Sequence, residues 1–156
     1  MKNNIFGALL AIAICEVVGS LGSIFTIPAI NGWYAGLAKA SLNPPNWIFG
    51  PVWTMLFALM GVAAYLVWSR RKDKSVKPAL LIFILQLLFN VLWSILFFGA
   101  HAPLPAAIEI IFLWIAILWT IIAFWKINRA AAWLLLPYLL WVTFAAYLNY
   151  SVVVLN

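Results

Sequence analysis

The chain has 156 residues, of which 68% are hydrophobic and only 8% are charged. Soluble domains carry about 25% charged residues, and a water-soluble fold of this length could not bury so much apolar surface. The net charge of +6 comes from basic residues clustered at loop ends, which favours a lipid bilayer as partner over nucleic acid. The composition predicts an all-α integral membrane protein that forms one domain over residues 1–156.

Five apolar segments are each close to the roughly 20 residues that a helix needs to cross a bilayer. The alternating segments of about ten residues that mark a β-barrel are absent. We expect the first segment to end at Pro28, and because it is long enough to span, we interpret it as a membrane helix and not as a signal peptide. The predicted spans are 5–27, 46–68, 78–100, 106–125 and 130–152.

The loops between these spans differ in length and charge. The first loop, 28–45, is long, and we expect a short helix within it near Trp33–Lys39. Five spans place the two termini on opposite sides, and eight of the nine basic residues then fall on one side: Lys2, the five bases of loop 69–77, Lys126 and Arg129. This bias predicts a multi-pass cell-membrane protein whose N-terminus and 69–77 loop are cytoplasmic, and whose 28–45 loop and C-terminus lie outside.

The stretch from Pro44 to Thr54 holds three prolines and two tryptophans at the mouth of the second span. Proline is tolerated at the start of a helix but not in its interior, so the chain is stiff here before it becomes helical. Trp47 and Trp53 are therefore held at a fixed place, which suits contact with a flat apolar ligand. Alternatively, these indoles anchor the helix at the lipid interface.

Helical spacing places aromatic and amide side chains on one face of three different spans. Buried amides must find partners, because lipid offers none. A pocket walled by indoles, phenols and amides suits a large, flat, mostly apolar molecule. Alternatively, the amides bond helix to helix and the aromatic residues only pack. The three faces are Trp53, Phe57, Met60 and Ala64; Gln86, Asn90, Trp93 and Phe97; and Tyr138, Trp141, Ala145 and Asn149.

Two acidic residues lie inside predicted spans. Glu16 is at the middle of the first span, aligned with Gly19, Ser20 and Ser23. A charge there costs roughly 2.5–3.5 kcal/mol on insertion scales, so we expect Glu16 to face protein, in a functional or a structural role. The small residues on that face predict close helix packing. Glu109 begins a packing face on the fourth span, and we interpret it as structural.

The sequence offers no conventional catalytic or metal site. No nucleophile–base pair, phosphate loop or metal cluster is present. The lone cysteine, Cys15, excludes a disulfide within the chain and a thiolate metal site. His101 lies in a predicted turn with no second ligand at workable spacing, so we interpret it as a solvated loop histidine. Hydrolysis and phosphoryl transfer are therefore not expected.

A set of aromatic, proline and amide motifs runs through nearly the whole chain. They are Gly-Trp-Tyr-Ala-Gly-Leu-Ala-Lys at 32–39, Pro-Pro-Asn-Trp-Ile-Phe-Gly-Pro-Val-Trp-Thr at 44–54, Met60-Gly61, Tyr65–Trp68, Gln86, Asn90, Phe97–Gly99 and Pro137–Tyr150. In this combination the chain resembles the TspO/MBR family. These are the tryptophan-rich sensory proteins related to the mitochondrial translocator protein, or peripheral benzodiazepine receptor.

The resemblance implies a five-transmembrane-helix bundle, often a homodimer, whose long first loop caps a ligand pocket. It implies binding of porphyrins such as protoporphyrin IX and of isoquinoline and benzodiazepine drugs. It also implies light- and oxygen-dependent breakdown of the porphyrin, with no further cofactor required. A tetrapyrrole or lipid transporter, or a stress-regulatory protein without catalysis, are the alternatives.

The resemblance also assigns site residues by position. The pocket would include Tyr34, Trp53, Asn90, Trp141, Ala145 and Leu148, beside Phe57, Trp93 and Tyr138 from the helical faces. Trp53 and Trp141 would face the macrocycle and carry the photo-oxidative chemistry. The chain departs from the family pattern in the first loop, where Lys-Pro-x-Trp is replaced by Lys39-Ala40-Ser41-Leu42. This departure leaves open how rigid the lid is and what replaces part of its ligand contact.

Overall fold

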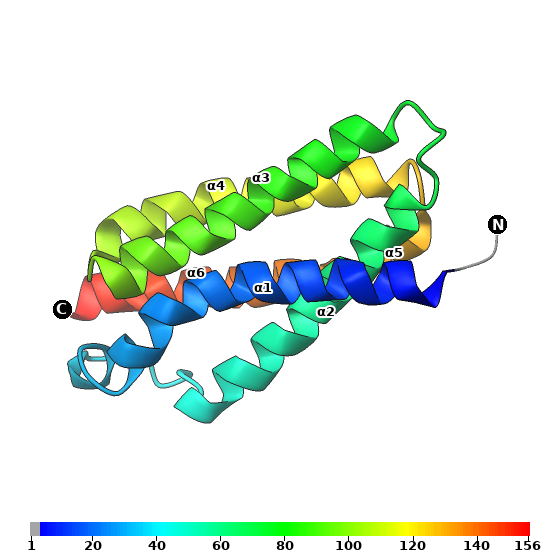
Figure 1. Ribbon diagram of the computed structural model, residues 1–156. Coiled ribbons are helices and arrows are strands. Elements are labelled where there is room, and N and C mark those ends of the chain that lie inside the picture. The colour runs from blue at the N-terminus through cyan, green and yellow to red at the C-terminus, as the bar shows by residue number, and fades with distance from the viewer. Residues whose placement is uncertain (1–3) are drawn as a thin grey trace.

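The computed structural model describes residues 4–156, and these form a bundle of five membrane-crossing helical segments (Figure 1). No strand occurs in this part of the chain, so the predicted all-α membrane fold is confirmed. The spans are α1 (Ile5–Ile30), α2 (Phe49–Trp68), α3 (Val76–Ser94) with the π-helix η3 (Ile95–Gly99), α4 (Pro103–Trp125), and α5 (Arg129–Leu134) with α6 (Leu136–Leu155). The first loop carries two short 3-10 helices, η1 (Tyr34–Gly36) and η2 (Asn46–Ile48).

The predicted end of the first span at Pro28 is wrong. Pro28 lies inside α1, which continues to Ile30 and ends where the Gly32 N–H donates to the carbonyl of Ala29 at 3.2 Å. Proline removes one backbone hydrogen bond, and membrane helices tolerate it where neighbouring protein groups compensate. Because Pro28 is only two residues from the helix end, the loss affects only the last turn.

The other boundaries move by a few residues, and prolines explain two of them. The third span begins at Val76 and not at residue 78, and the fourth begins at Pro103 and not at residue 106. A proline in the first helical turn sacrifices no internal hydrogen bond, so Pro103 opens α4. The fifth span is interrupted at Leu135 and resumes as α6, whose first turn contains Pro137.

The backbones of α1 and α2 lie very close together at Gly61. A Cβ atom added to Gly61 would lie 2.5 Å from the Cα of Ile12 and 2.9 Å from the carbonyl oxygen of Ala11. Only glycine permits two helix backbones to meet at this distance. From this contact the two helices diverge toward the end of the bundle that carries residues 31–48, which we name the lid end (Figure 1). The opposite end, with residues 69–75, is the basic end.

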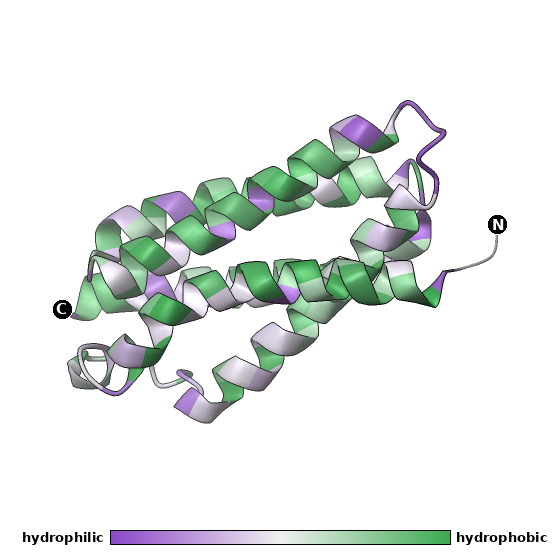
Figure 2. Cartoon of the chain, viewed as in Figure 1, coloured by the Kyte–Doolittle hydropathy of each residue, from purple (hydrophilic) through white to green (hydrophobic). Residues whose placement is uncertain are grey.

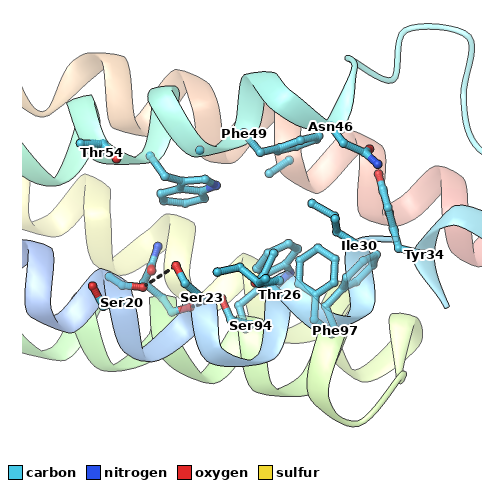
Figure 3. Close-up of a pocket in the computed structure, with 18 of the residues that line it drawn as sticks. Ser20, Ser23, Thr26, Ile30, Tyr34, Asn46, Phe49, Thr54, Ser94 and Phe97 are labelled. Carbon is cyan, nitrogen blue, oxygen red and sulfur yellow. Dashed lines mark hydrogen bonds between the residues drawn. The ribbon is translucent and has the colours of Figure 1, made fainter. Parts of the chain in front are cut away.

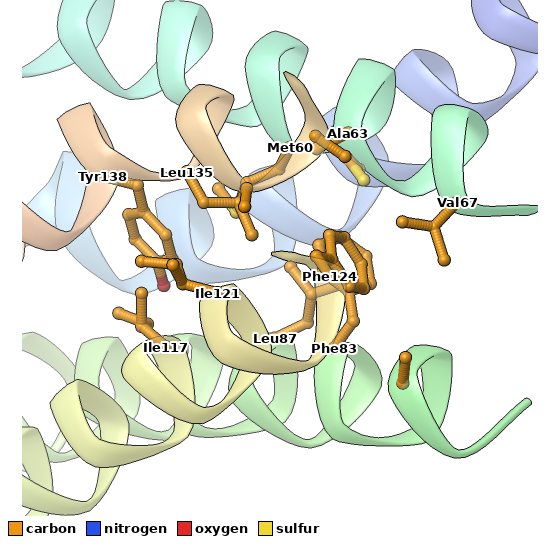
Figure 4. Packing of buried hydrophobic residues seen from close by; sticks show 14 of the residues in the cluster. Met60, Ala63, Val67, Phe83, Leu87, Ile117, Ile121, Phe124, Leu135 and Tyr138 are labelled. Atoms are coloured by element: carbon orange, nitrogen blue, oxygen red, sulfur yellow. The ribbon is translucent and has the colours of Figure 1, made fainter. Parts of the chain in front are cut away.

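The larger hydrophobic cluster extends from the middle of the bundle to the basic end, and a smaller one, with Tyr34 and Phe97, lies at the lid end. The Phe83 and Phe124 rings stack with centroids 5.7 Å apart, and Met60, Ala63 and Val67 of α2 are fully buried against them (Figure 4). Since α2 leans on α5 and the core at this end, its other half is free to stand away from α1.

Basic residues gather at the basic end, where Figure 2 shows the hydrophilic loop between α2 and α3. The guanidinium of Arg71 lies 4.5 Å from the ring centroid of Trp68, and that of Arg129 lies 5.5 Å from the ring of Trp125. Such cation–aromatic pairs are typical of a membrane–water interface. The structure therefore groups these charges as the sequence predicts, and the assignment of this end to the cytoplasm stays a prediction.

Replacing Gly61 with alanine tests the close approach of α1 and α2. The added methyl group would meet backbone atoms that cannot rotate away, so we expect a loss of about 1–3 kcal/mol in stability. The measurement is the midpoint of SDS-induced unfolding in detergent. Gly50→Ala is the matched control, because no atom lies within 4 Å of the added Cβ there. Equal midpoints for the two variants would contradict the backbone contact.

Candidate ligand-binding cavity

A cavity of about 430 Å³ lies in the lid-end half of the bundle, where α1 and α2 diverge. Its walls come from α1, α2, α3 with η3, and α6, and residues of the first loop close its lid end. Figure 3 shows side chains of α1 and α2 facing each other across it. The cavity is therefore intramembrane and is assembled from segments far apart in the sequence.

Aromatic side chains form the wall opposite α1. Trp53 projects from α2 and Trp141 from α6, and both line the cavity. The Trp53 ring is 5.7 Å from the ring of Phe57 and the Trp141 ring is 6.0 Å from that of Phe49. These edge and tilted arrangements are the favoured geometries of aromatic pairs, and they hold both indoles in place. Two large flat faces are thus presented to one volume.

The α1 wall is different, because it is polar. Ser20, Ser23 and Thr26 lie one helical turn apart along the cavity (Figure 3). Each hydroxyl donates to the carbonyl four residues earlier in α1, at 2.8, 3.3 and 3.1 Å. The carboxyl group of Glu16 continues this stripe at the end of the cavity farthest from the lid. The predicted alignment of Glu16 with small residues therefore serves the cavity as well as packing.

Amides both line the cavity and tie its helices together. The Asn90 side-chain amide donates to the Tyr138 hydroxyl at 3.1 Å, which joins α3 to α6. The Trp93 indole N–H donates to the Asn149 side-chain oxygen at 3.0 Å, and the Asn149 amide donates to the Pro103 carbonyl at 2.8 Å. Asn90, Trp93 and Asn149 therefore both border the cavity and hydrogen-bond one helix to another, so the two arrangements that the sequence leaves open occur together.

Tyr138 is the exception among the predicted site residues. Its side chain is only 1% exposed and lies in the core, behind Asn90 and 6.2 Å from the Trp53 ring. It does not line the cavity, so a direct ligand contact is not available to it. The other predicted positions do line it: Tyr34, Trp53, Phe57, Asn90, Trp93, Trp141, Ala145 and Leu148. Their roles in binding stay predictions.

Several lining residues were not predicted from the sequence. Thr26, Asn31, Asn46 and Phe49 all border the cavity. Thr26 falls one turn beyond Ser23, so its helical spacing could have been recognised. Asn31 and Asn46 flank the first loop, and only the fold brings them to the same opening. Trp47 lines the rim but is 74% exposed, which suits a lipid anchor, whereas Trp53 faces inward.

Three buried polar side chains in the described residues retain atoms without hydrogen-bond partners. They are the Trp141 indole nitrogen, the Gln86 side-chain oxygen and both carboxyl oxygens of Glu109. Trp141 lines the cavity, but its indole nitrogen is itself buried. Glu109 is buried in α4 outside the cavity, on the packing face with Ala116 and Thr120 that the sequence predicts.

Tyr34 closes the lid end of the cavity. Its side chain is 4% exposed, its ring packs edge-on against Phe97 and Phe98, and its hydroxyl donates to the Asn43 side-chain oxygen at 2.7 Å. Burial raises the pKa of the Tyr34 phenol above its ordinary value. The phenol therefore keeps its proton and its bond to Asn43 well into the alkaline range.

The lid is held by contacts that replace the missing family residues. The ammonium of Lys39 donates to the carbonyls of Tyr34 and Leu37, both at 2.8 Å, and of Ala35 at 3.2 Å. The Asn156 side chain pairs with both backbone groups of Ala38, at 3.0 and 3.1 Å. These bonds tie the loop down without the proline and tryptophan of the family pattern.

His101 also helps to hold the first loop. It lies in the turn before α4 with a φ of 52°, and its ring stacks on Trp33 with centroids 4.4 Å apart. Trp33 in turn contacts the edge of Phe97. The prediction of an exposed loop histidine is confirmed, and the stacking adds a contact between the loop and the bundle.

Comparison with known proteins identifies the family. The family model described as TspO/MBR matches residues 11–155. The chain belongs to the TspO/MBR family. It is 42% identical to the tryptophan-rich protein TspO of Chlorobaculum tepidum, over 100% of this chain and 99% of that protein. It is also 42% identical to the TspO of Archaeoglobus fulgidus, over 98% of this chain and 99% of the relative.

The family extends to animals. The translocator protein of Homo sapiens is 41% identical over 77% of this chain and 72% of its own length. Membership of the TspO/MBR family, together with five helices long and apolar enough to span, makes this chain a multi-pass, receptor-like membrane protein. The cavity described above lies within the segment that the family model matches.

Replacing Lys39 with methionine tests what orders the lid. The variant keeps the apolar stem but loses three hydrogen bonds to carbonyls, each a contribution of about 0.5–1.5 kcal/mol or more. We expect amide hydrogen exchange over residues 33–43 to accelerate about tenfold or more. Lys126→Met, at the basic end, is the control and should leave this exchange unchanged. Equal protection in the two variants would show that Lys39 does not order the lid.

Proposed function

We propose that the protein binds protoporphyrin IX in the cavity between α1 and the aromatic wall, and that it promotes light- and oxygen-dependent breakdown of the bound porphyrin. The observation that carries this proposal is the pair of indoles, Trp53 and Trp141, that face one intramembrane volume from different helices. Flat apolar rings gain both area burial and aromatic contact against such faces. Isoquinoline and benzodiazepine drugs would use the same faces.

The polar groups around the cavity support one orientation of the porphyrin. Its two propionates lie on one edge and need hydrogen-bond donors. The side-chain amides of Asn31 and Asn46 are exposed at the lid-end opening, where water is also closest. The Tyr34 hydroxyl is already donated to Asn43. We therefore place the propionates toward Asn31 and Asn46 and the apolar edge of the ring inside.

The protein would contribute to the chemistry in two ways: it would position the porphyrin, and it would supply a redox-active side chain. Bound porphyrin supplies the light absorption, and dissolved oxygen is the oxidant. Trp53 and Trp141 would lie against the ring. The packing of Phe49 and Phe57 against these indoles keeps them at the reacting edge.

Illumination of the protein in lipid nanodiscs with protoporphyrin IX, in air, tests this function. We expect loss of the porphyrin absorption and a new product, faster than in protein-free nanodiscs. Trp53→Phe and Trp141→Phe should each slow the loss about tenfold or more, equivalent to about 1.4 kcal/mol in barrier. Trp119→Phe is the control, since Trp119 is 54% exposed on α4 outside the cavity.

Binding is measured separately by quenching of tryptophan fluorescence. Saturable quenching with porphyrin loss equal to the protein-free rate would leave binding but refute the breakdown. Movement of unchanged porphyrin across sealed vesicles would instead support the transporter alternative. Absence of saturable quenching would refute the porphyrin site itself.

A further inference from the structure

The hydroxyls on the α1 wall of the cavity have no proton left for a ligand. Ser20, Ser23 and Thr26 each donate their single O–H to a carbonyl of their own helix. A hydroxyl in this state still carries oxygen lone pairs, so it accepts hydrogen bonds but does not donate them. Three successive turns of α1 therefore present acceptors to the cavity.

Glu16 extends this acceptor stripe to the deep end. Its side chain lines the cavity, and within residues 4–156 no basic residue lines it. No backbone or side-chain donor of the described chain is bonded to the Glu16 carboxyl. A carboxyl oxygen accepts hydrogen bonds in either protonation state, and the ionised form also attracts a cation. The deep end is thus an acceptor site that the protein's own donors leave free.

The opposite end of the cavity offers donors as well as acceptors. Asn31 and Asn46 bring amide N–H donors to the lid-end opening, and neither side chain is engaged in a described hydrogen bond. Ligand acids are favoured there and disfavoured near Glu16, where they would meet only lone pairs and negative charge. The two ends of the cavity therefore differ: free side-chain N–H donors are present at the lid end, and the side chains of Glu16 and the α1 hydroxyls offer only acceptors at the deep end.

We infer that Glu16, with the hydroxyl stripe of α1, is a specificity-determining residue: it selects flat aromatic ligands that carry a hydrogen-bond donor or an ammonium group toward α1, and it rejects ligands with a carboxylate at that place. The inference deepens the proposed function, and it rests on that function only in using the same cavity. For a porphyrin, it requires that the acidic edge stay at the lid end.

The test uses two ligands built on one isoquinoline carboxamide scaffold, which differ only in a terminal primary amine or a terminal carboxylic acid. At neutral pH these groups are an ammonium and a carboxylate. Binding is measured to the full chain in zwitterionic lipid nanodiscs. We expect the amine ligand to bind about tenfold or more tightly than the acid, because charge-assisted hydrogen bonds are the strong ones.

Glu16→Gln should reduce the amine-to-acid affinity ratio to about threefold or less, since glutamine keeps the shape and loses the charge. Glu109→Gln is the matched control: it changes the other acid buried in a span, which does not line the cavity, and it should leave the ratio unchanged. The midpoint of SDS-induced unfolding, measured on the same samples, confirms that each variant is folded, and protoporphyrin IX binding is measured beside it.

The inference is overturned if the acid binds as tightly as the amine, if neither ligand binds, or if Glu16→Gln and Glu109→Gln give the same ratio. These results are independent of porphyrin turnover. Amine selectivity that depends on Glu16 without porphyrin binding would retain the inference and refute the porphyrin function. Porphyrin binding together with an amine-to-acid affinity ratio that does not depend on Glu16 would retain the porphyrin site and refute the inference.

Discussion

The backbone contact between α1 and α2 at Gly61 is the constraint on which the rest of the structure depends. An added Cβ there would lie 2.5 Å from the Cα of Ile12, so no residue larger than glycine fits between the two helices at this point. Because α2 also leans on the core near the basic end, it cannot stay parallel to α1 over its whole length. The helices separate toward the lid end (Figure 1), and the cavity occupies the space between them.

Polar pairing then fixes the walls of that space. In a bilayer each buried amide or hydroxyl must bond within the protein. The bonds from Asn90 to Tyr138 and from Trp93 to Asn149 hold α3 to α6 on the aromatic side, while the hydroxyls of α1 bond back to their own helix. As a result, the aromatic side is cross-linked and the α1 side offers free acceptors. The lid is closed by the three bonds of Lys39 and the buried ring of Tyr34.

The sequence predicts the spans and several of the cavity residues, because both follow from simple periodicities. Apolar length marks the spans, and the 3.6-residue period brings Trp53 beside Phe57 and Trp141 beside Ala145. The same period wrongly placed Tyr138 in the pocket, since the exact rotation of α6 is set by Asn90 and the core. Pro28 was misread because a membrane helix tolerates a proline near its end. The hydrogen bonds between Asn156 and Ala38 and the opening shared by Asn31 and Asn46 join segments that no local pattern relates.

The central claim is that one intramembrane cavity between α1 and the indoles of α2 and α6 holds the ligand. The most direct measurement is a crystal structure of the protein with zinc protoporphyrin, in which the anomalous scattering of zinc marks the ring centre. The account predicts a single strong peak inside the cavity, between the α1 hydroxyls and the indoles of Trp53 and Trp141. A peak on a lipid-facing surface or outside the lid, with none in the cavity, would contradict it.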